Sequence, residues 1–180
     1  MAQQLSRTER RAAKAEIEDP AVVLEAALRF LEVRARSVAE VRRRLTSAGY
    51  RSELVEGAID RLTEIGVLDD EAFARSWVES RDRARPRGER ALRQELALKG
   101  VDREISDEIL EERRDAGEGS EVDLDAARRL LARNARSLAR VADPRARRQR
   151  AYALLARNGF DPDVCRQASA DLVEEPEGLD

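Results

Sequence analysis

Apolar residues recur at the same distances from three glycines, Gly49, Gly100 and Gly159. Counted from each glycine, positions −8, −4, +1, +5 and +9 are apolar in every copy, although only 42% of the whole chain is apolar. The fifteen residues are Val41, Leu45, Tyr50, Leu54 and Ala58 in the first copy, Leu92, Leu96, Val101, Ile105 and Ile109 in the second, and Ala151, Leu155, Phe160, Val164 and Ala168 in the third. A four-residue spacing follows one face of an α-helix, and glycine often ends a helix in left-handed backbone. The pattern predicts three copies of a helix, a glycine turn and a second helix.

Each glycine turn also predicts a contact and a following helix start. When a helix ends this way, the residue after the glycine packs on the residue four before it. The expected pairs are Leu45 with Tyr50, Leu96 with Val101, and Leu155 with Phe160. Ser52 and Asp102 are expected to cap the second helices of the first two copies. In the third copy, Asp161-Pro162 combines a capping carboxylate with a proline at the first helical position.

A further helical stretch precedes each pair, around residues 23–31, 73–78 and 124–131. Ser37-x-x-Glu40 is a capping box that opens the middle helix of the first copy, and Asp143-Pro144 opens that of the third. Because the glycines are 51 and 59 residues apart, we expect a longer first helix or loop around residues 138–143 in the third copy. The predicted fold class is all-α, with three tandem three-helix repeats forming an elongated, curved body.

The boundaries follow from the positions of these signals and from the polar stretches between them. We expect a flexible N-terminal segment at 1–18, repeat 1 at 19–68, repeat 2 at 69–116, a linker at 117–121, repeat 3 at 122–173, and an acidic flexible tail at 174–180. The composition agrees with small stacked units, because 39% of the residues are charged and only 3% are aromatic. Such a chain is too polar to surround one thick core.

The composition lacks the parts of most catalytic sites. There is no histidine, Cys165 is the single cysteine, and no phosphate-binding loop of the Gly-x-x-x-x-Gly-Lys kind is present. No stretch approaches the roughly 20 apolar residues of a membrane span, and residues 1–18 have no signal-peptide centre. We therefore expect a cytoplasmic protein that is not an enzyme, binds no cofactor or metal, does not contact membranes and is a monomer.

Three features have both a structural and a chemical interpretation. Asp69-Asp70-Glu71 could hold metal ions, but carboxylates in a first helical turn more often cap the helix. Phe73 and Trp77, one helical turn apart, could stack on nucleic-acid bases but more often form core. Cys165 could act as a nucleophile but is expected to fill core space. The structural interpretation is preferred for all three features.

The net charge of −3 conceals alternating blocks of charge. Basic blocks precede the glycine turns: +5 over 29–51, +4 over 81–93 and +8 over 128–150. Acidic blocks of −6 over 53–71 and −8 over 102–125 follow the first two turns. If the repeats stack in register, the basic middle helices form a ridge suited to phosphate or to a long acidic protein surface. For any single arginine, a solvated helix face with salt bridges is an equally good interpretation.

The arginines chosen as contacts come from repeats 1 and 2. They are Arg42, Arg43, Arg44, Arg81, Arg83, Arg87, Arg90 and Arg93. A helix-turn-helix DNA reader has similar spacing, and its second helix enters the major groove. Here the second helix of repeat 1 carries acidic residues, including Glu53, Glu56 and Asp60, which phosphates repel. Any nucleic-acid contact is therefore expected to be non-specific and to use the basic helices.

A series of short motifs in order resembles the bacterial RecX family, the regulatory proteins of the RecA recombinase. They are Ala27-Leu28, Arg36-Ser37-x-x-Glu40-Val41-x-x-x-Leu45, Gly49-Tyr50, Leu62-x-x-x-Gly66-Val67-Leu68-Asp69-Asp70-x-x-Phe73-Ala74, Arg81, Arg87-Gly88 and Leu92-x-x-Glu95-Leu96-x-x-Lys99-Gly100-Val101. The resemblance is strong over residues 21–112, and residues 122–173 match more loosely through Leu155-x-x-x-Gly159-Phe160.

The resemblance implies a non-catalytic protein of three tandem three-helix repeats. A protein of this family binds RecA, lodges in the groove of the RecA filament on single-stranded DNA, and inhibits filament extension, strand exchange and ATP hydrolysis. The negative net charge of this chain favours a protein surface as the main target, with weak non-specific DNA binding at most. A nucleic-acid-binding helical module that acts without RecA, or a helical scaffold for another protein, are the alternative hypotheses.

Overall fold

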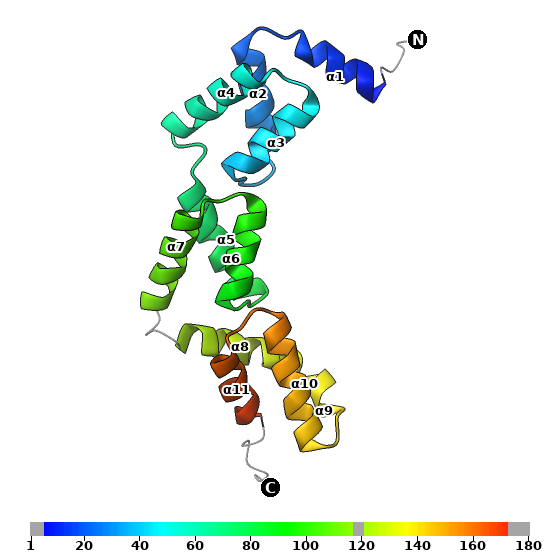
Figure 1. The fold of residues 1–180 in the computed structure, drawn as a ribbon, viewed down its shortest axis with the longest axis vertical. Coiled ribbons are helices and arrows are strands. Elements are labelled where there is room, and N and C mark those ends of the chain that lie inside the picture. Colours follow the sequence, from blue (N-terminus) through cyan, green and yellow to red (C-terminus); the bar gives the residue numbers. More distant parts are fainter. Residues whose placement is uncertain (1–5, 117–120, 173–180) are drawn as a thin grey trace. The chain divides into compact units, whose positions relative to one another are not determined.

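The computed structural model describes residues 6–116 and 121–172, and within these ranges the chain forms eleven helices and no strand (Figure 1). The helices are α1 (Arg7–Ala15), α2 (Pro20–Leu31), α3 (Val38–Ala48), α4 (Ser52–Glu64), α5 (Asp70–Ala84), α6 (Glu89–Lys99), α7 (Arg103–Asp115), α8 (Glu121–Arg133), α9 (Ala135–Ala139), α10 (Pro144–Arg157) and α11 (Pro162–Asp171). The all-α class and the three helix groups predicted from the sequence are confirmed. The expected tail, 174–180, and most of the expected linker lie outside the described residues.

The chain divides into two compact units. One contains the residues up to Phe73 together with Leu98–Asp102, and the other contains Ala74–Ala97 and the residues from Arg103 onward. In the first unit, α2 packs on α3 and α4, and α3 packs on α4. In the second unit, α10 and α11 both pack on α8, and α10 packs on α11 and α9.

The glycine turns have the predicted geometry. Gly49, Gly100 and Gly159 have φ values of 107°, 80° and 83°, in the left-handed region that glycine adopts without strain. The N–H of Tyr50 donates to the Leu45 carbonyl at 3.4 Å, and the corresponding bond from Phe160 to Leu155 measures 3.3 Å. Thirteen of the fifteen repeat positions are buried, and the two others, Leu54 and Ile105, are half-buried.

The predicted helix starts are confirmed in most cases. Ser37 and Glu40 form the capping box of α3, and the side chains of Asp143 and Asp161 accept bonds from backbone N–H groups at the starts of α10 and α11. The prediction for Ser52 is wrong by one residue. Ser52 is already helical, and Arg51 occupies the cap position without a side-chain cap bond.

Helix α1 lies within residues 1–18, for which the polar sequence predicts a flexible segment. Ser6 and Glu9 form a capping box, in which the Glu9 N–H donates to Ser6 Oγ at 3.2 Å and the Ser6 N–H donates to Glu9 Oε2 at 2.7 Å. The same motif identified the start of α3, but the segment here carries no apolar stripe, so the periodicity did not reveal it. Arg11 of α1 lies so close to Gly49 that a Cβ on this glycine would overlap the Arg11 backbone.

The third repeat contains a fourth helix. Helix α8 ends at Arg133, and α9 follows immediately, with Leu138 buried in the core of this repeat. This short helix, with the turn after it, accounts for the longer interval before Gly159. The prediction had placed a longer helix or loop around residues 138–143. Cys165 is buried in the same core, as predicted, and burial raises the pKa of its thiol.

A similar contact joins the start of one middle helix to the turn after the next one. In the first unit, Ser37 Oγ donates to the Lys99 carbonyl at 2.6 Å. In the second unit, the Gly88 N–H donates to the Asn158 carbonyl at 3.0 Å. Ser37 and Gly88 each stand twelve residues before a repeat glycine, and Lys99 and Asn158 each stand immediately before one. We call this arrangement the cap-to-turn contact.

The cap-to-turn contact at Gly88 predicts a strong effect of one added methyl group. Gly88→Ala places a Cβ into the backbone of Gly159 and Phe160, and should lower the free energy of unfolding by about 1–3 kcal/mol or more. The matched control is Gly57→Ala, since Gly57 is exposed within α4 and has nothing within 4 Å of an added Cβ. This control should stabilise the protein by about 0.5–1 kcal/mol. Thermal and urea unfolding followed by circular dichroism measure both, and equal stability of the two variants would contradict the assignment.

Candidate partner-binding and nucleic-acid surfaces

Of the three arginines chosen in repeat 1, one is neutralised and two are available. The Arg42 guanidinium makes two hydrogen bonds of 2.7 Å to the Glu56 carboxylate across α3 and α4, and this pairing raises the pKa of Arg42. Arg43 is exposed and forms no ion pair with any described residue. Arg44 lies over the Phe30 ring, with its guanidinium carbon 5.6 Å from the ring centre. Arg43 and Arg44 therefore keep charge that an acidic partner could use.

Most of the arginines chosen in repeat 2 bind carboxylates of the same repeat. Arg81 and Arg87 both reach Glu95 of α6, at 2.6 Å and 3.4 Å. Arg81 also stacks on the Trp77 ring at 4.3 Å, and the Trp77 indole N–H donates to Glu95 at 2.9 Å. Phe73 is buried as predicted, whereas Trp77 lies at the rim of the core as part of this network. These groups fix α5 against α6 rather than facing solvent freely.

The remaining chosen arginines differ in their surroundings. Arg93 binds Glu89 and Asp107 at 2.7 Å each, and these bonds raise the pKa of Arg93. Among the described residues, Arg83 pairs only with Glu79, in an exposed contact of 3.7 Å one helical turn away. Arg90 is exposed and forms no ion pair with a described residue. The salt-bridge interpretation thus describes Arg42, Arg81, Arg87 and Arg93, and leaves Arg43, Arg44, Arg83 and Arg90 as the candidates for contact.

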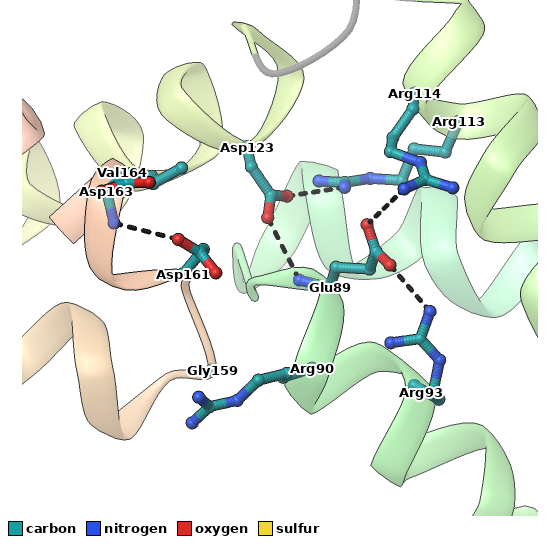
Figure 2. A pocket seen from close by; sticks show the side chains of 10 residues that line it. All are labelled: Glu89, Arg90, Arg93, Arg113, Arg114, Asp123, Gly159, Asp161, Asp163 and Val164. Carbon is teal, nitrogen blue, oxygen red and sulfur yellow. Dashed lines mark hydrogen bonds and ion pairs between the residues drawn. The ribbon is translucent and has the colours of Figure 1, made fainter.

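A cavity of about 470 Å³ lies in the second unit where α6, α7, α8 and α11 approach one another (Figure 2). Its charged lining residues are four acids and four arginines: Glu89, Asp123, Asp161, Asp163, Arg90, Arg93, Arg113 and Arg114. Figure 2 shows Asp123 between Arg113 and the start of α6, and Glu89 between Arg93 and Arg114. Because the two signs balance and most of these groups bind each other, the cavity has no preference for an anion or a cation.

Arg113 is the central residue of this network. Its guanidinium binds Asp82 of α5 at 2.8 Å and 2.9 Å, and Asp123 of α8 at 2.7 Å. Only 7% of the side chain is exposed. Burial by itself would lower the pKa of Arg113, but the bonds to both aspartates outweigh burial and raise it. Arg113 therefore ties three helices of the second unit together.

A second charged centre lies at the cap-to-turn contact of the first unit. The Glu40 carboxylate accepts from Arg34 and Lys99 at 3.0 Å each, and from the Ser37 N–H at 3.4 Å. Burial would raise the pKa of Glu40, but these donors outweigh burial and lower the pKa from 4.5 to about 2. Glu40 thus links the start of α3 to the residue before Gly100.

The acidic cluster at the start of α5 behaves as two helix caps. Asp69 Oδ1 accepts from the Ala72 N–H at 2.9 Å, which is the predicted cap of α5. Asp70 Oδ1 instead accepts from the Val38 N–H at 2.9 Å, at the start of α3. Burial raises the pKa of Asp70, and this effect outweighs the hydrogen bond from the Val38 N–H, which lowers the pKa. Among the residues that the structure describes, no group of three or more potential metal ligands occurs.

Two further basic surfaces consist mostly of residues outside the eight chosen arginines. A hollow of about 760 Å³ between α1 and α3 is lined by the cations Arg10, Arg11, Lys14 and Arg44 and by no acidic residue. The second surface consists of arginines on α9, on the first half of α10 and in the turn between them. These are Arg136, Arg140, Arg145, Arg148 and Arg150, which are exposed. Residues 128–150 carry the strongest basic block of the sequence, whereas the eight arginines chosen as contacts all belong to repeats 1 and 2.

Exposed apolar side chains have a different distribution. The large ones are Val22, Leu28, Val33, Ile65, Val67 and Leu98, and all belong to the first unit. Among the described residues of the second unit no large apolar side chain is exposed to a comparable degree. Apolar side chains scattered in this way are common on protein surfaces, so they do not by themselves mark a binding site.

The three groups of helices and their glycine turns define an all-helical repeat protein. Three sequence models match the triplets in order: RecX, first three-helix domain, over residues 24–62; RecX, second three-helix domain, over 69–110; and RecX, third three-helix domain, over 121–168. The chain belongs to the RecX family, as the sequence motifs predicted. Its relatives carry the name regulatory protein, and a regulatory role in this family fits DNA repair and recombination.

Individual relatives agree with this assignment. Regulatory protein RecX of Mycobacterium avium is 34% identical over 151 residues, which cover 83% of this chain and 84% of the relative. Regulatory protein RecX of Mycolicibacterium vanbaalenii is 35% identical over 157 residues, covering 83% and 82%. The crystal structure of RecX from Lactobacillus salivarius has the same fold, with a TM-score of 0.74 at 20% identity, over 87% of this chain and 97% of that one. Among the described helices, none is both long and apolar enough to cross a membrane.

The lowered pKa of Glu40 predicts a pH-dependent contribution to stability. Because the folded pKa of about 2 lies below the ordinary value of 4.5, the contribution is complete above about pH 5 and is lost as pH falls toward 2. Glu40→Gln should therefore destabilise the protein at pH 7, and the difference from the parent should shrink between pH 5 and 3. Urea unfolding at several pH values measures this. The exposed control Glu53→Gln should change the free energy of unfolding by less than about 0.5 kcal/mol at pH 7, and a pH-independent deficit for Glu40→Gln would contradict the assignment.

The buried position of Arg113 predicts a large loss when one partner is removed. Arg113→Met leaves Asp82 and Asp123 without their shared cation, and should cost about 3–5 kcal/mol in the free energy of unfolding. The control is Arg103→Met, because Arg103 is 86% exposed in its pair with Asp107 and should contribute less than about 1 kcal/mol. Equal urea midpoints for the two variants would show that Arg113 does not stabilise this unit.

Proposed function

We propose that this protein binds RecA and the RecA filament on single-stranded DNA, and that it inhibits filament extension, ATP hydrolysis and strand exchange. The observation that carries the proposal is the match of all three repeats, in order, to the three RecX domains. The proposal involves no catalysis by this chain. It also places the action in the cytoplasm, where RecA filaments form on single-stranded DNA.

The distribution of surface groups supports a protein target for the first unit. The exposed apolar side chains of α2 and of the turns provide area that gains free energy when it is removed from water. Arg43 and Arg44 on α3 add charge that no described carboxylate neutralises. An apolar surface with a few unneutralised arginines is suited to a protein with an acidic, partly apolar face.

A second function, binding of nucleic acid without RecA, is favoured by one specific observation. The arginines of α9 and α10 have no acidic partner among the described residues, so they retain attraction for phosphate. The two functions are compatible, since a RecA filament presents both protein and DNA.

The primary test is the DNA-dependent ATPase of RecA with substoichiometric amounts of this protein. We expect ATP hydrolysis to fall and filaments to shorten by electron microscopy. Unchanged hydrolysis together with unchanged filament assembly would contradict the proposal. A pull-down with RecA, with and without single-stranded DNA, separates binding to free RecA from binding to the filament.

A charge-reversal variant tests the contribution of α3. Arg43→Glu with Arg44→Glu should raise the concentration for half-inhibition of the ATPase about tenfold, because two attractive contacts become repulsive. Arg42 is left intact, since its reversal would also break the pair with Glu56. The control is Arg61→Glu on α4, where the parent arginine is exposed in a local pair with Glu64. If the control loses as much inhibition as the double variant, α3 is not a specific contact.

A further inference from the structure

The third repeat has an excess of positive charge that its own acids do not neutralise. Residues 134–150 contain six arginines and a single acid, Asp143. Both carboxylate oxygens of Asp143 are used at the start of α10, where they accept from the Arg145 and Ala146 N–H groups at 3.2 Å and 3.1 Å. Asp143 is therefore poorly placed to pair with an arginine side chain as well.

Several other acids of this repeat are also engaged elsewhere. Asp123 binds Arg113, and Asp171 binds Arg128 at 2.9 Å. Asp163 pairs with Arg166 on α11. Within the described part of the chain, no carboxylate therefore forms an ion pair with Arg136, Arg140, Arg145, Arg148 or Arg150. In repeat 2, by contrast, the basic helices are largely paired with acids.

Local geometry gathers these arginines at one end of the repeat. The Arg147 guanidinium donates to the carbonyls of Val141 and Ala142 at 3.1 Å and 3.5 Å, which holds the start of α10 against the turn after α9. Arg140, the cap residue directly after α9, and Arg145, in the first turn of α10, stand on either side of this turn. Arg148 follows Arg145 by three residues and so lies on the same face of α10. In Figure 1 this end of the repeat is the yellow segment that connects α9 to α10.

Two observations favour nucleic acid over an acidic protein as the ligand. The described residues of the third repeat expose no large apolar side chain, whereas protein interfaces usually bury aromatic and apolar groups at their centre. Tyr152, one helical turn beyond Arg148, packs against the core of the repeat but is only half-buried. Its exposed part would let a base stack while the arginines hold phosphates. Guanidinium groups with a neighbouring aromatic ring are typical of surfaces that bind single strands without sequence preference.

We infer that Arg140, Arg145 and Arg148, with Tyr152, form a binding site for the sugar-phosphate backbone of single-stranded nucleic acid. The site deepens the proposed function, because it identifies the part of the chain that contacts DNA in a filament. Its chemistry does not require RecA. The arginines of repeats 1 and 2 contribute less to this contact, since most of them are neutralised within the fold.

The test measures binding of a fluorescein-labelled 30-residue oligothymidylate by anisotropy, without RecA, from 20 to 200 mM KCl. The variant is Arg140→Gln, Arg145→Gln and Arg148→Gln combined. We expect its affinity at 50 mM KCl to be at least tenfold lower than that of the parent. The slope of log affinity against log salt should decrease in magnitude by about 2, because three phosphate contacts are lost at about 0.7 each.

The matched control is Arg29→Gln, Arg103→Gln and Arg166→Gln combined, since these arginines are also exposed but pair with acids of their own helices. The control should bind within twofold of the parent. Tyr152→Leu should lower affinity about fivefold with an unchanged salt slope, because it removes stacking and no charge. Circular dichroism melts that match the parent establish that each variant is folded.

Three results would overturn the inference: no binding by the parent at 20 mM KCl, equal losses in the two triple variants, or displacement of the DNA by poly-glutamate at equal charge concentration. The last result would assign the surface to an acidic polypeptide instead. The binding result does not depend on the proposed inhibition of RecA, because RecA is absent from these mixtures. Loss of DNA binding with retained inhibition of RecA, or the reverse, would distinguish the two.

Discussion

The left-handed glycine at the end of each middle helix is the constraint on which the rest of the fold depends. At Gly49 and Gly159 it stops the helix so that the next residue packs back on the residue four before the glycine. At Gly100 and Gly159 it also turns the preceding carbonyl toward the start of another middle helix. The same left-handed turn therefore packs the helices of one repeat together and also forms the cap-to-turn contact. Gly88 carries the tightest form of this contact, since no side-chain atom fits between it and Gly159.

Helix α1 contacts the first repeat glycine, Gly49. Arg11 of α1 lies against Gly49, as Ala39 of α3 lies against Gly100 and Ala91 of α6 lies against Gly159. Helix α1, a short polar helix opened by a capping box, thus covers the first glycine turn. It also lines, together with α3, a hollow that contains only basic charges.

Pairing of charges separates the structural arginines from those that remain available. Arg113, Arg81 and Arg93 bind carboxylates across helix interfaces, where their charge holds neighbouring helices together. The arginines at the α9–α10 end have no such partners among the described residues, because Asp143 is used as a helix cap. The net charge of −3 therefore gives a misleading impression of the surface. A protein with a negative net charge still has a strongly basic surface region when its acidic residues lie on other parts of the fold.

The sequence by itself determined the elements and the family. Apolar spacing, capping boxes and glycine stops depend on backbone conformation within a few residues, so the three helix triplets, the caps at Ser37, Asp143 and Asp161, and the burial of Cys165 were predictable. A polar helix such as α1 escaped detection because periodicity requires apolar residues. Only the tertiary structure decided which arginines are free. The partners of Arg113 and Arg81 lie between 10 and 31 residues away along the chain, and such pairs form through helix packing that no local pattern specifies.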